Sequence, residues 1–473
     1  MFDGPIDPIW VENLNSVLDD NKKLTLNTGE TIKLSPSMNI LIEAENLSSC
    51  TPATISRCGM IYMQEENISV KALFNKWLKT LPDTIEENLF EIENMCQWFF
   101  PEILNLMKPN NLMYPCSHKW LVLNFTRLFD ALIRDYHNEK YNNINQNAFN
   151  VFDGQKEAGS SKAANFEKNK KTPLVSFADI ESRYLNSINY KNLWIEAFFV
   201  FSLVWSFGYM LKPHLLKDFN RIIKKKIIGN KEELPTVAQL KSKLRNDHVK
   251  RYQEFEPSPD FIELKRPPYF LLPFPNECSI FDIVYDLETN SWVTFESIKD
   301  EFPKSSDNEL KKKSDYYNIF IQSEESIKYS YLIAANALSN KSILLIGPTG
   351  CGKSWLARDV CFNYLPQISQ KFRIASVAFS HNTDSKKAQN FFDSRLDRRR
   401  KNVYGPPFGI NYIFYIDDLM MPATDDYGVK SANELIRQWF DYNGWYDHRT
   451  LEHSKIEDIQ FIGCITTYGK FNQ

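Results

Sequence analysis

The chain has 473 residues, a length that suits two or three folding domains better than one ordinary core. Hydrophobic residues make up 43% of it, which allows packed cores and excludes a wholly disordered protein. The formal net charge is -3, so no global electrostatic attraction to nucleic acid is expected. Eight cysteines lie scattered without metal-ligand spacing, which is typical of reduced thiols in a cytosolic protein.

The first elements are predicted to be a strand end, a helix, a hairpin and a strand. Residues 2–4 read like the carboxyl end of a buried strand that delivers Asp3 to a site. The Asp-Pro pair at residues 7–8 suits an N-cap and the first helical position. Residues 23–34 predict a β-hairpin, and residues 38–42 predict a further strand that ends in an acid.

The middle of the chain is predicted to be helical. Residues 70–135 and about 177–226 carry helical patterns rich in large apolar side chains. Between them, residues 138–173 are too poor in apolar residues to bury a core and are interpreted as a disordered insertion. Residues 197–211 offer about 15 apolar positions where a membrane span needs roughly 20, so a buried helix is predicted rather than a span.

A second α/β pattern follows a charged connector. Residues 281–285 and 292–295 flank a turn and predict a hairpin, and residues 326–337 predict a helix. Residues 342–346 then predict a buried strand that leads directly into a glycine-rich loop.

That loop, GPTGCGKS, is a complete GxxxxGK[ST] phosphate-binding motif followed by a helix. Its residues are Gly347, Pro348, Thr349, Gly350, Cys351, Gly352, Lys353 and Ser354. Backbone N–H groups of such a loop surround the phosphates of ATP or ADP, Lys353 reaches the β and γ phosphates, and Ser354 ligates Mg²⁺. A mere glycine-rich turn is the alternative, and the strand–loop–helix order argues against it.

A second acidic site is predicted on a neighbouring strand. Residues 412–416 are continuously apolar, as a strand buried on both faces should be, and Asp417 and Asp418 follow. Asp417 is expected to hold Mg²⁺ through water, and Asp418 to stand where a base orients the attacking water. Most ATPases of this design have Glu there. Because a misplacement of about 1 Å costs roughly a hundredfold in rate, we expect binding to survive better than hydrolysis.

The order of elements after Asp418 repeats the order at the start of the chain. A helix at residues 431–442, the sequence GWYD, and a strand at residues 459–465 follow the acid, just as a helix, hairpin and strand follow Asp3. The chain is therefore predicted to hold the back half of one nucleotide-binding module and the front half of the next. The front half of the first module is expected upstream.

The amino-acid sequences of these elements are similar to those of dynein heavy chains. The stretch from FDGPIDPIWVENLN to TPATISRCGMIYM resembles their second AAA+ module, and GPTGCGKS, RLDRRRKNVYGPPFG, FYIDDLMMPATDDYG and ELIRQWFDYNGWYD resemble their third. The resemblance implies an α/β fold, in which AAA+ P-loop NTPase cores of parallel sheet and flanking helices are joined by an all-helical lid subdomain. The implied parts are residues 1–64, a lid at 65–260 and the next large domain at 261–473.

The resemblance also implies roles for single residues. Asp3 matches the Walker B aspartate of the second module, and Gly4 stands where a catalytic Glu would be. Arg57 matches the arginine extended toward nucleotide on the preceding module, where a guanidinium stabilises a transferring phosphoryl group. From the residues alone, Arg57 is a loop arginine, for which a surface ion pair is commoner. Thr466, just past the last strand, falls at a sensor position.

Dynein heavy chains are microtubule motors with six AAA+ modules in a ring, and the DDLMMP wording resembles the axonemal, single-headed inner-arm type. The implied function is nucleotide-dependent regulation, with little or no hydrolysis at this site, of microtubule-based movement of cilia or flagella. Implied partners are the remaining AAA+ modules and, through regions outside this chain, dynein intermediate and light chains and microtubules. Neither nucleic acid nor a membrane is expected. The implied location is the cytoskeleton of the cytoplasm, in the axoneme.

Two other functions stay open at this point. One is a stand-alone AAA+ or P-loop ATPase, which would need its own lid and a trans-acting arginine. The other is a non-hydrolysing structural fragment whose nucleotide only stabilises folding, so that melting depends on nucleotide without turnover. The chain is expected to be a piece of a longer motor or a truncated gene product.

Overall fold

The structure is a computed structural model that describes most of the chain. Described are residues 1–134, 190–228, 270–301 and 322–466, apart from residues 5, 45–46, 64–68, 115, 271–273, 276–277, 288 and 427. The predicted insertion at residues 138–173 lies outside the described residues. The chain divides into two compact units: unit 1 comprises residues 1–67, 344–351 and 371–473, and unit 2 comprises residues 68–343 and 352–370.

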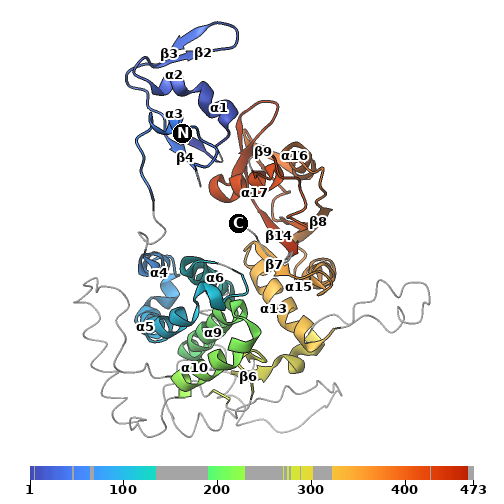
Figure 1. Cartoon of the computed structure of the whole chain (residues 1–473). Helices are drawn as coiled ribbons and strands as arrows, with labels where there is room; N and C mark the ends of the chain where they lie inside the picture. The colour runs from blue at the N-terminus through green and yellow to red at the C-terminus, as the bar shows by residue number, and fades with distance from the viewer. Residues whose placement is uncertain are drawn as a thin grey trace, which may run out of the picture. The chain divides into compact units, whose positions relative to one another are not determined.

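Unit 2 is built around a bundle of helices (Figure 1). Its helices are α4 (Val70–Leu78), α5 (Leu89–Leu106), α6 (His118–Leu132), α9 (Tyr190–Phe207) and α10 (Leu216–Ile228), with the short 3-10 turn η6 (Gly208–Met210) after α9. Serine N-caps begin two of them, since the side chain of Ser69 accepts from Ala72 N–H and that of Ser117 from Trp120 N–H. The predicted helical character of this region is confirmed.

Helix α9 lies in the aromatic core of the bundle. The ring of Phe125 on α6 meets Phe199 and Phe207 of α9 at centroid distances of 5.2 and 6.3 Å. Among the described residues, Asn192–Met210 is the one stretch long and apolar enough to cross a membrane, yet 89% of it is buried inside the protein. A core helix passes the same test, so the packing agrees with the predicted buried helix.

Unit 2 continues into a hairpin and a long helix. Strands β5 (Ile283–Asp286) and β6 (Ser291–Thr294) pair antiparallel, as predicted, and α13 (Glu324–Leu338) follows. After the chain has passed through β7 (Ile343–Gly347), it returns to unit 2 as α14 (Lys353–Arg358), a π-helical turn η11 (Asp359–Tyr364) and α15 (Leu365–Ile368).

Unit 1 contains a four-stranded sheet in the order β7-β14-β11-β8. Strand β11 (Asn411–Asp417) pairs in parallel with both β8 (Phe372–Ala378) and β14 (Ile459–Thr466). Helices α16 (Ser385–Asp393) and α17 (Ser431–Tyr442) pack together beside it. A smaller sheet has the order β12 (Gly444–Tyr446), β13 (His453–Ile456), β10 (Val403–Gly405) and β9 (Asp397–Arg400).

The prediction that residues 342–346 form a buried strand was wrong in its burial. Strand β7 stands at the edge of the described sheet, and the side chain of Leu344 is 44% exposed. The apolar run of a parallel strand predicts burial only where neighbours cover it on both faces. Strand β11, in the middle of the sheet, has that cover and is buried over residues 413–416.

The first 63 residues of unit 1 follow the predicted order of elements. Helix α1 (Pro8–Asn13) has Asp7 as its N-cap, α2 (Asn15–Leu18) follows, and β2 (Lys23–Thr25) pairs with β3 (Thr31–Lys33). The strand expected at residues 38–42 is shorter: β4 is Ile42–Glu43 and pairs in parallel with β1, Phe2–Asp3. A strand extends only as far as its neighbour pairs with it, and β1, the neighbour of β4, has two residues.

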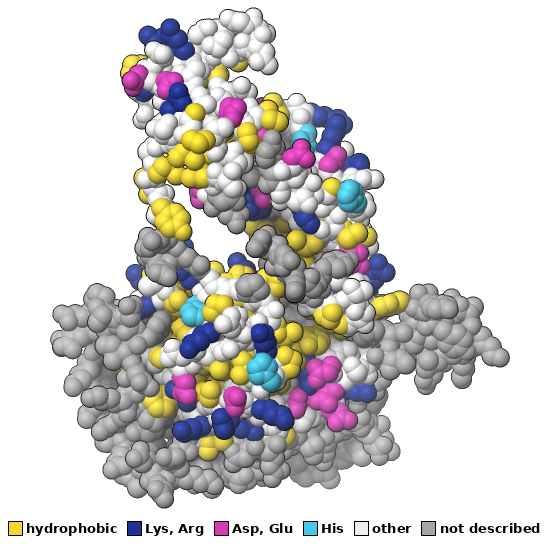
Figure 2. All heavy atoms as spheres, viewed as in Figure 1, with side chains coloured by type: hydrophobic (Ala, Val, Ile, Leu, Met, Phe, Trp, Pro, Cys, Tyr) yellow, Lys and Arg dark blue, Asp and Glu magenta, His cyan; other side chains and the backbone are white. Residues whose placement is uncertain are grey.

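Apolar side chains gather over β1 and β4 on the face drawn in Figure 2. Met1, Phe2 and Leu41 are among the exposed large hydrophobic residues of the chain. Contiguous apolar surface of this kind marks a contact face on a folded protein.

Candidate functional site

The phosphate-loop motif lies between a strand and a helix, as the sequence predicts. Strand β7 ends at Gly347 and α14 begins at Lys353. Gly350 and Gly352 have φ angles of 85° and 83°, in the left-handed region that favours glycine. Gly352 is also the N-cap of α14. Two of the motif's glycines are therefore required by the backbone of the loop itself.

The motif is divided between the two units. Residues 347–351 belong to unit 1, whereas Gly352, Lys353 and Ser354 belong to unit 2 with the rest of α14. Lys353 and Ser354 are the first two residues of that helix. Their predicted roles toward phosphate and Mg²⁺ stay predictions.

The two predicted Walker B acids occupy different backbone positions. Asp417 is the last residue of β11, and its carbonyl accepts a hydrogen bond of 3.0 Å from the N–H of Phe379. Asp418 has left the strand: its φ is 53°, and its N–H donates to Asp417 Oδ1 at 3.2 Å. Aspartate tolerates this left-handed conformation better than most residues. The Asp417 side chain is half-buried, and Asp418 is exposed.

Thr466 is the last residue of β14, rather than just past it as the sequence analysis placed it. Because β14 and β11 run in parallel, their carboxyl ends meet at one edge of the sheet. Ile416 lies opposite Gly463, so Thr466 is on the same edge as Asp417. Ligands of open parallel sheets bind outside such carboxyl ends.

Asp3, the last residue of β1, contacts helix α17 within unit 1. The phenol of Tyr442 donates a hydrogen bond to Asp3 Oδ2, and Arg437 Nη1 lies 3.5 Å from the same oxygen. The bond to Asp3 raises the pKa of Tyr442. Arg437 also pairs with Glu434 at 2.8 Å and with Asp441 at 2.6 Å, so its guanidinium is held by three acids.

Beside this contact, unit 1 has a cavity of about 870 Å³. Its charged lining residues are Asp3, Glu43, Asp426, Lys430, Glu434 and Arg437. Of the residues in this contact, Asp3 was predicted from the sequence, whereas Arg437 and Tyr442 were not. Tyr442 and Asp3 are 439 positions apart, and no local pattern joins residues at that separation.

Arg57 forms an ion pair within its own segment. Its Nε lies 2.6 Å from Asp19 Oδ1, and its Nη1 donates to the carbonyl of Ala53 at 2.7 Å. This is the commoner alternative that the sequence left open for a loop arginine. The role toward a neighbouring nucleotide stays a prediction, and it would require the pair with Asp19 to open.

Within the described part of the chain, no group of three or more His, Cys, Asp or Glu side chains is placed to hold a metal ion. Mg²⁺ is usually bound through one or two carboxylates together with substrate phosphates, not by a cage of protein ligands. The hydroxyl of Ser354 and the carboxylate of Asp417 are each of the oxygen-donor kind that Mg²⁺ prefers, and their role toward the ion stays a prediction.

Comparison with known families adds to this geometry. The family model described as P-loop containing dynein motor region matches residues 308–473, and the one described as dynein heavy chain AAA lid domain matches residues 175–297. The chain belongs to the dynein heavy chain family. The resemblance to dynein heavy chains is thereby confirmed, and so is the α/β AAA+ fold with its parallel sheet, flanking helices and lid.

Individual relatives are dynein heavy chains of axonemal type. Mouse dynein axonemal heavy chain 12 is 30% identical over 473 residues, which is 99% of this chain and 13% of the relative. Mouse dynein axonemal heavy chain 1 is 29% identical over 481 residues, 98% of this chain and 9% of the relative. Human dynein axonemal heavy chain 3 is 26% identical over 477 residues, which is 99% of this chain and 10% of the relative. The chain thus spans roughly a tenth of these relatives' length.

Proposed function

We propose that this dynein chain runs from the back half of the second AAA+ module, through a lid, to the front half of the third, and that the third module binds ATP or ADP with Mg²⁺. The observation that carries the proposal is the complete GPTGCGKS motif between β7 and α14, within the region matched by the dynein motor family. The proposed parts are residues 1–64, 65–260 and 261–473.

The proposed roles follow from the chemistry of each side chain. Lys353 supplies the cation that faces the β and γ phosphates, and Ser354 and Asp417 hold Mg²⁺ directly or through water. Thr466, at the same sheet edge as Asp417, is proposed as the sensor of the bound nucleotide. Asp418 takes the position of the base.

Removal of the Lys353 charge tests the nucleotide site. We expect Lys353→Ala to abolish binding of a fluorescent ATP or ADP analogue with Mg²⁺, measured by fluorescence titration. Lys386→Ala, at an exposed position on α16, is the matched control and should bind like the parent chain. Unchanged affinity in Lys353→Ala would overturn the assignment.

The shorter acid at Asp418 supports regulation in place of rapid hydrolysis. We expect the parent chain to turn over ATP slowly, and Asp418→Asn to change nucleotide affinity little and leave turnover low. Release of phosphate at an ordinary enzyme rate of about 1 to 10³ per second, lost in Asp418→Asn, would contradict this reading.

The relatives' names place those proteins in axonemes, and we propose the same setting for this chain, as part of a ring that moves along microtubules. The first half-module would then receive its remaining strands from upstream sequence. The exposed apolar side chains over β1 and β4 support this, because such strands would cover them. Intermediate and light chains would bind through other regions of the heavy chain.

A further inference from the structure

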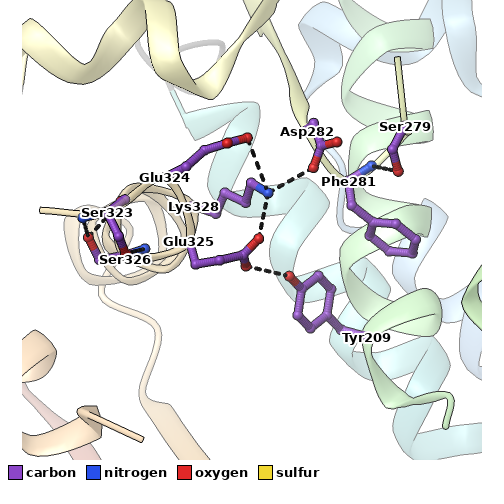
Figure 3. Close-up of polar contacts among 9 residues, drawn as sticks. All are labelled: Tyr209, Ser279, Phe281, Asp282, Ser323, Glu324, Glu325, Ser326 and Lys328. Carbon is purple, nitrogen blue, oxygen red and sulfur yellow. Dashed lines mark hydrogen bonds and ion pairs between the residues drawn. The ribbon is translucent and has the colours of Figure 1, made fainter. Parts of the chain in front are cut away.

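Lys328 is a lysine buried in a cluster of acids. Its side chain, on α13, is 3% exposed. Its Nζ lies 2.8 Å from Asp282 Oδ1, 2.8 Å from Glu325 Oε1 and 3.5 Å from Glu324 Oε1 (Figure 3). Figure 3 also shows the phenol of Tyr209 directed at Glu325, to which it donates a hydrogen bond of 3.4 Å. We call these five residues the Lys328 cluster.

The cluster keeps its central charge despite burial. Burial opposes the ammonium, but the hydrogen bonds and charges of Asp282 and Glu325 outweigh it and raise the pKa of Lys328. The three carboxylates remain 42%, 50% and 61% exposed, so water weakens their mutual repulsion. Removal of the lysine would leave three partly exposed acids without their common partner, so their repulsion would no longer be offset and the contact of α13 with Asp282 would be lost.

The Lys328 cluster contains residues from both regions of the chain that match dynein family models. Tyr209 and Asp282 lie within the lid match at residues 175–297. Glu324, Glu325 and Lys328 lie within the motor-region match that begins at residue 308. The contacts of Lys328 with Asp282 and of Glu325 with Tyr209 therefore join the region that matches the lid model to the start of the region that matches the motor model.

The other end of α13 contacts the helices of residues 70–132, which lie outside the lid match but within unit 2. The Ser339 hydroxyl donates to the carbonyl of Ala131 on α6 at 3.1 Å, and Lys341 lies 3.8 Å from Asp130. Asp130 is itself fixed by Trp77, whose indole N–H donates to it at 2.8 Å. Within unit 2, one end of α13 thus contacts η6 and the residue before β5, and the residues just after its other end contact α6.

Helix α13 in turn packs against α14, the helix that begins at the end of the phosphate loop. Within unit 2, α14 and η11 pack against α13, and the next residues after α13 lead directly into β7. Lys353 and Ser354, the first residues of α14, therefore belong to the same compact unit as the lid.

We infer that the Lys328 cluster positions Lys353 and Ser354 by holding α13, and with it α14, on the lid. Lys328 is a positioning residue in this scheme, since it acts through two helices and touches no nucleotide. The inference rests on the proposed nucleotide site and adds a specific control of its affinity: the lid of one module sets how well the next module's loop binds phosphate.

The test compares Lys328→Met with a matched control inside the lid. Lys226 on α10 is also nearly buried, 10% exposed, and pairs with Glu102 of α5 at 2.9 Å, a contact that does not involve α13. Affinity for a fluorescent ADP analogue with Mg²⁺ is measured at a temperature where circular dichroism shows all variants folded. We expect Lys328→Met to weaken binding about tenfold, within the range of typical coupling between sites. Lys226→Met should stay within about twofold.

Two further variants cover the case that Lys328→Met does not fold. Lys328→Arg keeps the charge and should bind like the parent chain, and Tyr209→Phe removes one hydrogen bond and should weaken binding by a smaller factor in the same direction. Equal affinities for Lys328→Met and Lys226→Met, or for Tyr209→Phe and the parent, would overturn the inference.

Hydrogen exchange without nucleotide separates this inference from the proposed function. Amides of α13 and α14 should exchange faster in Lys328→Met than in Lys226→Met, whether or not the chain binds nucleotide. If the parent binds no nucleotide, the proposed function fails, and this exchange difference still decides whether the cluster positions α14. Equal exchange in the two variants would refute the cluster's role directly.

Discussion

Asp393, at the end of α16, is an acid whose surroundings favour its protonated form. Although the residue as a whole is exposed, its carboxyl accepts a hydrogen bond of 3.1 Å from the indole of the fully buried Trp445. Burial is the main cause that raises the pKa of Asp393 to about 6, and the neighbouring charge of Asp447 adds to it. The hydrogen bonds from Trp445 and Gln389 oppose the shift without cancelling it.

This shift predicts a pH dependence of stability. The folded pKa of about 6 exceeds the ordinary Asp value of 3.8, so the folded state holds the proton more tightly than the unfolded state. The contribution of Asp393 should therefore be most favourable below about pH 4 and decline as the pH rises to about 6. In urea titrations from pH 4 to 7, Asp393→Asn should lack this decline. Asp397→Asn, at an exposed position, is the control, and an Asp393→Asn profile parallel to the parent would contradict the prediction.

Single residues also mark where the sequence stops being informative. The GPTGCGKS motif could be read because its chemistry is local, with eight consecutive residues that form one loop. Lys328 could not, because EESIK reads as an exposed helix with ordinary i,i+3 and i,i+4 ion pairs. The partner that this local pattern leaves out is Asp282, 46 positions upstream. Arg437 was missed for the same reason, since its partner Asp3 lies at the other end of the chain.

At the scale of elements, Gly208 fixes how α9 turns into η6. A Cβ on Gly208 would lie 2.7 Å from Phe219 Cε1 and 2.8 Å from two ring atoms of Phe281. Both rings belong to the core of unit 2, and neither can withdraw without displacing its neighbours. The glycine is required here by space, which is why the helix end and two rings can pack so closely.

We expect Gly208→Ala to destabilise unit 2 by about 1 to 3 kcal/mol, the usual cost of one extra group in a packed core. Thermal unfolding followed by circular dichroism measures it. Gly59→Ala is the control, because a Cβ there meets nothing within 4 Å, and its change should stay within about 0.5 kcal/mol. Equal stability of the two variants would show that the rings move aside.

The sequence predicted elements better than their surroundings. The Asp7 cap, the two hairpins, α17 and the strand–loop–helix order could all be predicted, because each depends on periodicity or on residues a few positions apart. The edge position of β7 and the two-residue length of β4 were not, since both depend on which strands stand beside them. An apolar run predicts a strand and leaves its neighbours undetermined.

At the scale of the whole molecule, the two units have separate hydrophobic cores. Phe125, fully buried, has ring contacts with Trp77, Phe100, Phe129 and Phe199 in unit 2. Phe392, also fully buried, has ring contacts with Phe414, Trp445 and Phe461 in unit 1. No residue is shared by these two clusters of described side chains. Segments that share one hydrophobic core unfold together. Two separate cores therefore predict two separate unfolding transitions.

Calorimetry of the intact chain should therefore resolve two components. Phe125→Ala and Phe392→Ala each remove a buried ring and should cost about 3 to 5 kcal/mol, because the cavity adds to the lost burial. In units of this size that lowers a midpoint by roughly 10 °C. Each variant should lower one component and leave the other within about 2 °C, and the components should differ between the two. If either variant lowers both components together, the units unfold as one, and the lid and the sheet form a single cooperative structure.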